Sequence, residues 1–174
     1  DMQLDGHFRR VKKLWEEAFE EVRQQEAAEG RQRVDPAVVQ FSLKNRTPDE
    51  LQAIRDFLNG EPVAEIKGTE FIPDGRPLID RVAEFFYEGY NNKVTNPEIG
   101  DVILDRRGAK DSIGHGDGRT EVAAVALVPD IIERGKVVDS QQNWKGRGYD
   151  TYVIVAPVKI GDQEFFGIVV VKKE

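Results

Sequence analysis

The sequence predicts an α+β fold in which helices precede an antiparallel β-sheet. Three observations lead to this prediction. Apolar residues recur at helical spacing in several segments of the first two thirds of the chain. The C-terminal part is rich in valine and isoleucine, which favour strands. Gly161 and Asp162 separate its last two apolar runs, as the turn residues of a β-hairpin do.

The N-terminal half is predicted to be mainly helical. Its first helix carries Phe8, Trp15 and Phe19 at helical spacing, with charged residues between them. Thr47 and Glu50 form a capping box around a proline, which predicts the start of a second helix. The expected elements are, in order, a helix over 6–28, a strand over 38–43, a helix over 48–58, a strand over 63–71 and a helix over 78–90.

The C-terminal half is predicted to change from helix to sheet. Pro129 lies inside an apolar helical pattern over 120–133 and should kink that helix or split it in two, because proline lacks the N–H that the helix needs. The expected elements are a strand over 101–104, a short helix around Asp111, the helix over 120–133, and strands over 136–140, 152–160 and 164–172.

The composition excludes several classes of protein. The chain has no cysteine, which excludes disulfides, thiolate zinc sites and a cysteine nucleophile, and fits a protein that works in a reducing cytoplasm. No apolar run approaches the roughly 20 residues of a membrane span, so we expect no membrane association. The net charge is −7, but residues 106–174 hold 11 basic and 10 acidic side chains. The last third of the chain could therefore form a local basic cleft.

The segment 110–116 contains one of only two histidines in the chain, His115, between two glycines. Glycines on both sides let a ligand approach the backbone closely and leave the imidazole accessible. Histidine is the side chain best suited to proton transfer near neutral pH. Lys110, Ser112 and Arg119 are close in sequence. We therefore expect His115 to be a general acid or base with a functional role.

The segment 143–151 gathers cations, aromatic rings and a hydroxyl in a loop between two expected strands. Lys145 and Arg147 could hold a phosphodiester and stabilise its pentacoordinate transition state. Trp144 and Tyr149 could stack on bases. We expect this segment and His115 to share a single groove.

Metal and cofactor chemistry find little support in the sequence. Two distant histidines, no thiol and scattered aspartates give no ligand pattern. A phosphate-binding loop and a dinucleotide fingerprint are both missing, so we expect neither a metal nor a cofactor. RNA cleavage without metal fits these residues, because the 2′-hydroxyl of the substrate is the nucleophile. One histidine cannot fill both proton roles at once, so Tyr149, Lys145 or a group on the substrate would serve as the second.

Residues 96–172 resemble a known family. The segments 110–116 and 143–151, the apolar helix ending at 128–135 and the sequence Ala-Pro-Val at 156–158 are together similar to phage-encoded toxin-like nuclease domains of the barnase–EndoU–colicin–RelE superfamily. Such domains lie at the ends of long phage or prophage polyvalent proteins. The resemblance implies helices followed by a four-stranded antiparallel sheet that carries the active site, and a metal-independent endoribonuclease activity, often against tRNA.

The resemblance also implies roles for individual residues and a partner. His115 corresponds to the catalytic histidine of these domains. The implied strand-side catalytic partners are Lys145, Arg147, Tyr149 and Thr151, and the implied substrate contacts are Lys110, Ser112 and Arg119. A cognate immunity or antitoxin protein is the implied partner, and the implied location is the cytoplasm of the host or target bacterium, with delivery as part of a larger phage protein.

The expected organisation has three parts, and two other functions fit the same residues. The parts are a helical appendage and linker over 1–45, an acidic α/β accessory segment over 46–95 that packs on the next domain, and the nuclease domain over 96–174. The first alternative function is a non-catalytic phage assembly or partner-binding module. The second is an ADP-ribosyltransferase-like toxin, which the Arg147 and Tyr149 cluster would permit. The sequence leaves the RNA target and the oligomeric state open.

Overall fold

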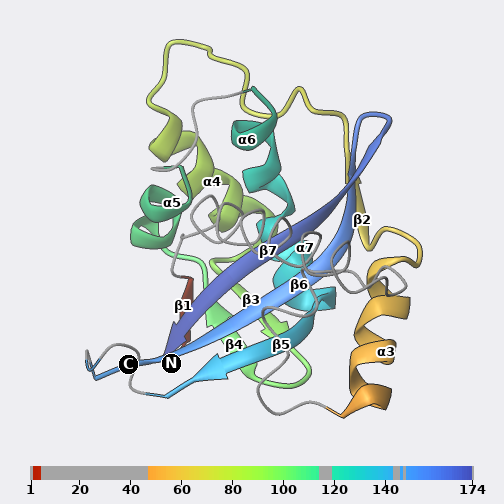
Figure 1. The fold of residues 1–174 in the computed structure, drawn as a ribbon. Coiled ribbons are helices and arrows are strands. Elements are labelled where there is room, and N and C mark those ends of the chain that lie inside the picture. The colour runs from red at the N-terminus through yellow and green to blue at the C-terminus, as the bar shows by residue number, and fades with distance from the viewer. Residues whose placement is uncertain (1, 5–46, 114–118, 143–145, 147, 174) are drawn as a thin grey trace.

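The protein is an α+β structure built on one seven-stranded sheet (Figure 1). The computed structural model describes residues 2–4, 47–113, 119–142, 146 and 148–173. The expected helix over 6–28 and strand over 38–43 lie outside these residues. The predicted fold class is confirmed. No helix in the described part of the chain is long and apolar enough to span a bilayer.

The elements follow the chain in a simple order. The helices are α3 (Pro48–Leu58), α4 (Leu78–Tyr90), α5 (Arg106–Ile113), α6 (Arg119–Ala124), the 3₁₀ turn η1 (Val125–Leu127) and α7 (Val128–Arg134). The strands are β1 (Met2–Leu4), β2 (Ala64–Ile66), β3 (Lys93–Asn96), β4 (Gly100–Ile103), β5 (Lys136–Gln141), β6 (Asp150–Ile160) and β7 (Gln163–Lys173).

The sheet is mixed, whereas the sequence predicted an antiparallel one. The strand order is β2-β6-β7-β1-β4-β3, and β5 also pairs with β6. The β6–β7 hairpin, with its predicted turn at Gly161 and Asp162, forms the antiparallel centre. The two parallel pairs are β1 with β4 and β2 with β6. Both involve strands from the N-terminal half, whose pairing partners local sequence patterns do not specify.

The two long strands are buried on both faces, because successive side chains point to opposite sides of a sheet. One face carries Ile154 and Val169 and packs against α4 and α7. The other face carries Val153, Val155, Ile168 and Val170, and it packs against Ile54 and Leu58 of α3. The helices α3 and α4 both belong to the expected accessory segment 46–95, and they pack against opposite faces of β6 and β7. The expected boundary at residue 95 falls within β3.

Local signals account for the helices. The Thr47 side chain accepts a 3.2 Å hydrogen bond from the backbone N–H of Glu50, which caps α3 as predicted. The expected helix over 120–133 is divided into α6, η1 and α7. Pro129 lies in the first turn of α7, where its missing N–H costs little. The predicted interruption of this helix is confirmed.

The expected strand over 63–71 is much shorter in the structure and ends with β2. The backbone N–H groups of Lys67 and Gly68 both donate to the Glu70 carboxylate, at 2.9 Å each. The side chain thus replaces a neighbouring strand as the hydrogen-bond acceptor and turns the chain away from the sheet. Phe71 follows with a φ of 57°, in the left-handed region that stops an extended strand.

Two residues explain how α7 and β2 fit against the central hairpin. Pro157 lies between the stretches of β6 that pair with β5 and β2, where a missing N–H leaves no gap in a ladder. Its carbonyl accepts a 2.8 Å bond from the N–H of Val63. Gly167 lies beneath Ile131 of α7, and a Cβ there would be 2.4 Å from the Ile131 Cδ1. Glycine at this position therefore lets the helix approach the sheet closely.

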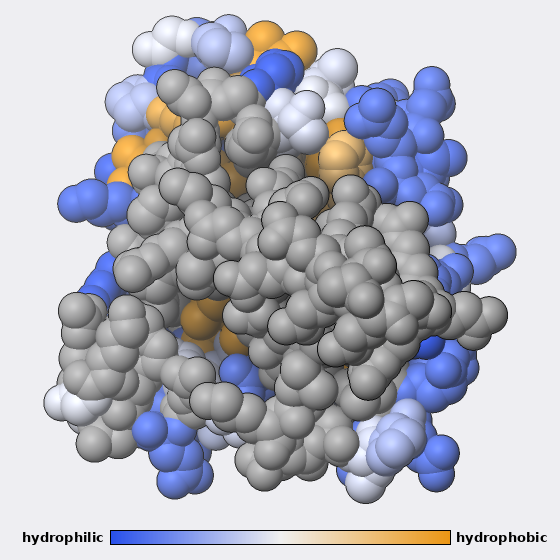
Figure 2. All heavy atoms as spheres, in the orientation of Figure 1, coloured by the Kyte–Doolittle hydropathy of each residue, from blue (hydrophilic) through white to orange (hydrophobic). Residues whose placement is uncertain are grey.

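The described surface in Figure 2 is mainly hydrophilic. Hydrophobic residues, coloured orange, are exposed in the upper part of this view. In Figure 1 this part contains α4, α6 and the loop that precedes α4. Ile72, in that loop, is one of the exposed large hydrophobic side chains, with 52% of its surface accessible. Arg81 holds the loop by donating to the Ile72 carbonyl at 2.5 Å.

Candidate functional site

Thr151 and Lys172 form a buried polar pair at the end of the β6–β7 hairpin that lies away from its turn. They are direct cross-strand partners, and each exposes only 6% of its surface. The Nζ of Lys172 lies 5.0 Å from the centre of the Tyr149 ring. The three residues therefore form one cluster, which we call the Lys172 cluster.

The register of the sheet fixes the face on which this cluster lies. Thr151 lies two residues from Val153 on β6, and Lys172 lies two residues from Val170 on β7, so each pair of side chains points to the same face. Both side chains therefore continue the face that α3 covers, opposite the layer formed by α4 and α7. The same face changes from apolar under α3 to polar at the end of the hairpin.

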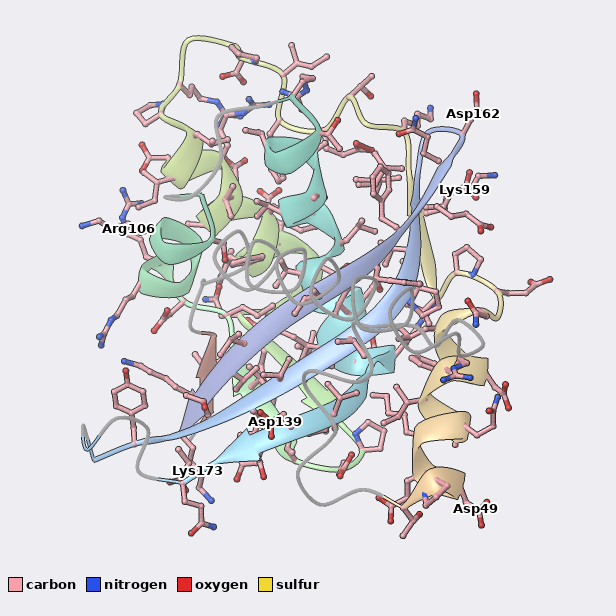
Figure 3. All side chains as sticks on the ribbon, in the orientation of Figure 1. Asp49, Arg106, Asp139, Lys159, Asp162 and Lys173 are labelled. Carbon is pink, nitrogen blue, oxygen red and sulfur yellow. The ribbon has the colours of Figure 1, made fainter. Side chains whose placement is uncertain are left out.

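A β-bulge adds a carboxylate to this face. The register of β5 against β6 shifts between Val137 and Asp139, so that Asp139 lies opposite Val153. Without the extra residue, Asp139 would project to the other face. Figure 3 shows Asp139 and Lys173 at this end of the sheet, and Lys159 and Asp162 at the opposite end of the hairpin.

The environment of Lys172 favours interaction with an anion. A buried ammonium group has lost most of its hydration, and the face of the Tyr149 ring compensates for part of that loss. An electrostatic interaction with a desolvated charge is stronger than one with a solvated charge. A cation held in this way is fixed before a ligand arrives, which is the arrangement that stabilises developing negative charge.

The predicted substrate contacts on α5 and α6 lie in the helical layer. Lys110 is exposed on α5, which packs against α4. Ser112 exposes 8% of its surface, and its buried Oγ has no hydrogen-bond partner. The Arg119 guanidinium donates to the carbonyls of Phe71, at 3.1 Å, and Gly68, at 3.4 Å. In this structure Arg119 therefore ties the loop after β2 to α6.

The structure brings some of the predicted residues together and separates others. Tyr149 and Thr151 lie with Lys172, as members of one cluster. Lys110, Ser112 and Arg119 belong to the layer on the other face of the sheet. The remaining predicted residues, His115, Trp144, Lys145 and Arg147, lie outside the described residues. The expected groove shared by His115 and the segment 143–151 remains a prediction.

Sequence reasoning missed Lys172 and Asp139. A signal for Lys172 is present, because it continues the alternation of Ile168 and Val170 on a buried face. If the strand continues to residue 172, this alternation places the lysine on the same buried face. No comparable signal exists for Asp139, since its orientation depends on a bulge.

The turn end of the hairpin has a different character. A cavity of about 530 Å³ is lined mainly by residues around β2 and the hairpin, among them Glu61, Glu65 and Glu164. A second cavity, of about 580 Å³, includes Glu70 and Asp162. Carboxylates on both sides repel phosphate groups. Of the two ends of the hairpin, the end with the Lys172 cluster is the one suited to an anionic ligand.

Two half-buried groups in the helical layer have shifted pKa values. Burial raises the pKa of Asp130, and the charge of Glu133 raises it further, against the opposing effect of Arg134. Burial also raises the pKa of Tyr90, with additional contributions from Asp130 and Glu133. These groups lie on α4 and α7, on the face away from the Lys172 cluster. We therefore attribute to them an effect on stability rather than a role in that cluster.

In the described part of the chain, no group of three or more histidine or acidic side chains is arranged to hold a metal ion.

The comparisons with known proteins identify a family for the second half of the chain. A family model described as large polyvalent protein-associated domain 3 matches residues 78–174, from the first residue of α4 through the Lys172 cluster. The match covers more than half of the 174 residues. The same comparisons found no match among curated proteins and none among solved structures.

Proposed function

Since the chain belongs to the large polyvalent protein-associated domain 3 family, we propose that residues 78–174 act as the endoribonuclease module of a phage or prophage polyvalent protein. The observation that carries this proposal is the buried pair of Thr151 and Lys172 beneath the Tyr149 ring. It supplies a desolvated cation, a hydroxyl and an aromatic ring, and two of these residues, Tyr149 and Thr151, follow the segment 143–147 in sequence. A cation and a hydroxyl can bind a phosphate, and a ring can stack on a base.

The proposed reaction needs no metal and no protein nucleophile. The 2′-hydroxyl oxygen of the substrate attacks the adjacent phosphorus as its proton passes to a base. The bond from phosphorus to the 5′-oxygen breaks, and that oxygen takes a proton from an acid. The products are a 2′,3′-cyclic phosphate and a free 5′-hydroxyl. General acid and base groups of this kind typically contribute about 10²–10⁴-fold each.

Each candidate residue has a defined role in this reaction. His115 transfers a proton. Lys145, Arg147 and Lys172 stabilise the charge of the pentacoordinate phosphorus, and Thr151 donates a hydrogen bond to one of its oxygens. The rings of Tyr149 and Trp144 stack on bases next to the cleaved bond. We assign Lys110, which is exposed, to a more distant substrate contact, and Arg119 to holding the loop of Phe71.

The partner and the location follow from this activity. An endoribonuclease harms the cell that makes it, so we propose a cognate immunity or antitoxin protein as its natural partner. The module would act in the cytoplasm of the host or target bacterium, where RNA is available. We propose that it reaches that compartment as part of the larger polyvalent protein.

The direct test incubates the purified full chain with total RNA in the presence of EDTA. We expect fragments that carry 2′,3′-cyclic phosphate ends. His115→Ala should lose most of the activity, whereas His7→Ala, which removes the other histidine, should retain it. Intact RNA after incubation with the wild-type chain, or equal cleavage by His115→Ala, would falsify the proposal.

A second candidate function is a non-catalytic partner-binding or assembly module. The observation that favours it concerns Arg119, a predicted substrate contact. Its guanidinium donates hydrogen bonds to two backbone carbonyls and so has a structural role. In that case the chain would still bind its partner when His115 and Lys172 are both replaced. The cleavage assay separates the two functions, because the ribonuclease proposal alone predicts cleavage by the wild-type chain and its loss in the His115→Ala/Lys172→Met variant.

A further inference from the structure

The sheet of the family module is completed by a strand from outside the module. The family match begins at residue 78, but β1 consists of Met2–Leu4. This strand lies between β7 and β4, which both belong to the matched region. Figure 1 shows β1 beside the end of β7, although the two are almost the whole chain apart in sequence.

The contacts of β1 are made on both of its sides. Gln3 is the antiparallel partner of Lys172 on β7 and the parallel partner of Ile103 on β4. Met2 pairs in the same way with Lys173 and Val102. Among the described strands, β1 is the only one that joins the β3–β4 hairpin to the rest of the sheet. Without it, the edges of β4 and β7 would face each other across a gap one strand wide, which we call the strand slot.

The occupant of the strand slot is short. Three residues form few main-chain hydrogen bonds. The entropy lost on ordering the backbone offsets part of the stabilisation that each bond provides. The edges on either side carry unpaired N–H and C=O groups whenever the slot is empty, and such edges are templates for another strand. A short strand between two such edges is therefore exchangeable, while the edges themselves retain a strong preference for being paired.

We propose that the strand slot is a strand-acceptor site and that β1 is its detachable occupant. The ligand class is an extended peptide segment that runs antiparallel to β7 and parallel to β4. Main-chain hydrogen bonds provide its recognition, as in other cases of strand addition. In this chain residues 2–4 occupy the site in cis. The proposal concerns binding alone and does not depend on ribonuclease activity.

The first test uses hydrogen exchange on the full chain and on a Gln3→Pro variant. Proline at the central position of β1 removes a main-chain donor and should empty the slot. We expect the amides of 100–103 and 171–173 to exchange at least about tenfold faster in the variant, with exchange in α4 unchanged. A synthetic peptide of residues 1–8 should restore protection, and the same peptide with proline at the position of Gln3 should not. Unchanged exchange in the variant, or no restoration by the first peptide, overturns the proposal.

The second test covers the case in which Gln3→Pro does not fold. The chain has no cysteine, so an engineered pair gives an unambiguous disulfide. Met2→Cys with Lys173→Cys places two thiols on direct cross-strand partners. Oxidation should yield an intramolecular disulfide that blocks binding of the 1–8 peptide, and reduction should restore binding. The matched control pairs Met2→Cys with Lys159→Cys, at the far end of β6. Equal peptide binding by the oxidised and reduced forms of the first pair contradicts the proposal.

Discussion

Thr151 and Lys172 face each other across the β6–β7 ladder, on the side of the sheet opposite the helical layer. Both are almost completely buried, although one is hydroxylated and the other charged. In a purely structural hairpin these positions would continue the neighbouring valines and isoleucine on the same face. Their polarity supports our proposal that this end of the hairpin holds an anionic ligand.

The first prediction concerns the charge of Lys172. Lys172→Met keeps a similar side-chain length and removes the ammonium group. We expect RNA cleavage to fall by roughly 100- to 1,000-fold, which is typical for the loss of one preorganised electrostatic contact. Lys173→Met is the matched control, since the neighbouring lysine is exposed and lies on the other face. Gel-based cleavage assays measure the effect, and equal loss in both variants would contradict a specific role of Lys172.

The second prediction concerns the approach of α7 to the sheet. A methyl group in Gly167→Ala would lie 2.4 Å from Cδ1 and 3.0 Å from Cγ1 of Ile131. We expect a loss of about 1–3 kcal/mol in the free energy of unfolding, as is usual for overpacking. Ile131→Val, which removes the Cδ1 atom, should recover part of this loss in the double variant. Gly89→Ala is the control, because no atom lies within 4 Å of the added Cβ.

The third prediction concerns Asn96, whose side chain joins the β3–β4 hairpin to the end of α7. Its Nδ2 donates to the Ile132 carbonyl at 2.9 Å, and its Oδ1 accepts from the N–H of Glu98 at 2.8 Å. Asn96→Asp keeps the acceptor but places a buried carboxylate against a carbonyl. We expect the variant to lose about 2–4 kcal/mol of stability at pH 7. Chemical denaturation measures it, and Asn59→Asp, at an exposed position, should change little.

The fourth prediction concerns the pH dependence of stability. Because burial raises the pKa of Asp130 above its ordinary value of 3.8, the fold favours the neutral carboxyl. The resulting stabilisation is complete below that value and is lost as the pH rises through the folded-state pKa. Asp130→Asn should therefore have a higher Tm than the wild type at pH 7, and the difference should shrink towards pH 3.

The control for this prediction is Asp49→Asn. Asp49 also lies in the first turn of a helix, but it is exposed. There the interaction of the carboxylate with the helix dipole is the main effect, so the amide should leave Tm unchanged or lower it. An equal gain in Tm for both variants would mean that burial is not the cause.

Sequence reasoning predicted best those parts of the fold that local interactions determine. The helix α3 begins at its cap, α7 begins next to its proline, and the hairpin turns at Gly161, as expected. The strands β1 and β3 were missed. Each is short, and each exists because a partner distant in sequence or a tight turn completes its hydrogen bonds.

The candidate site was predictable only in part, for a related physical reason. Tyr149 and Thr151 stood out because the segment around them is unusually rich in chemically active side chains. Lys172 is a neighbour of Thr151 only through the pairing of β6 with β7. Asp139 reaches the same face only through an irregularity in β5. Cross-strand neighbours become visible once the register is known, and the register is a property of the whole sheet.

The pairing of β1 with the end of β7 has a consequence for biosynthesis. Residues 2–4 are synthesised well before their antiparallel partners, 171–173. The sheet therefore cannot close during translation of the residues between them. Final assembly waits for the C-terminal strand to emerge, so a nascent chain arrested before β7 lacks both the complete sheet and the cluster around Lys172.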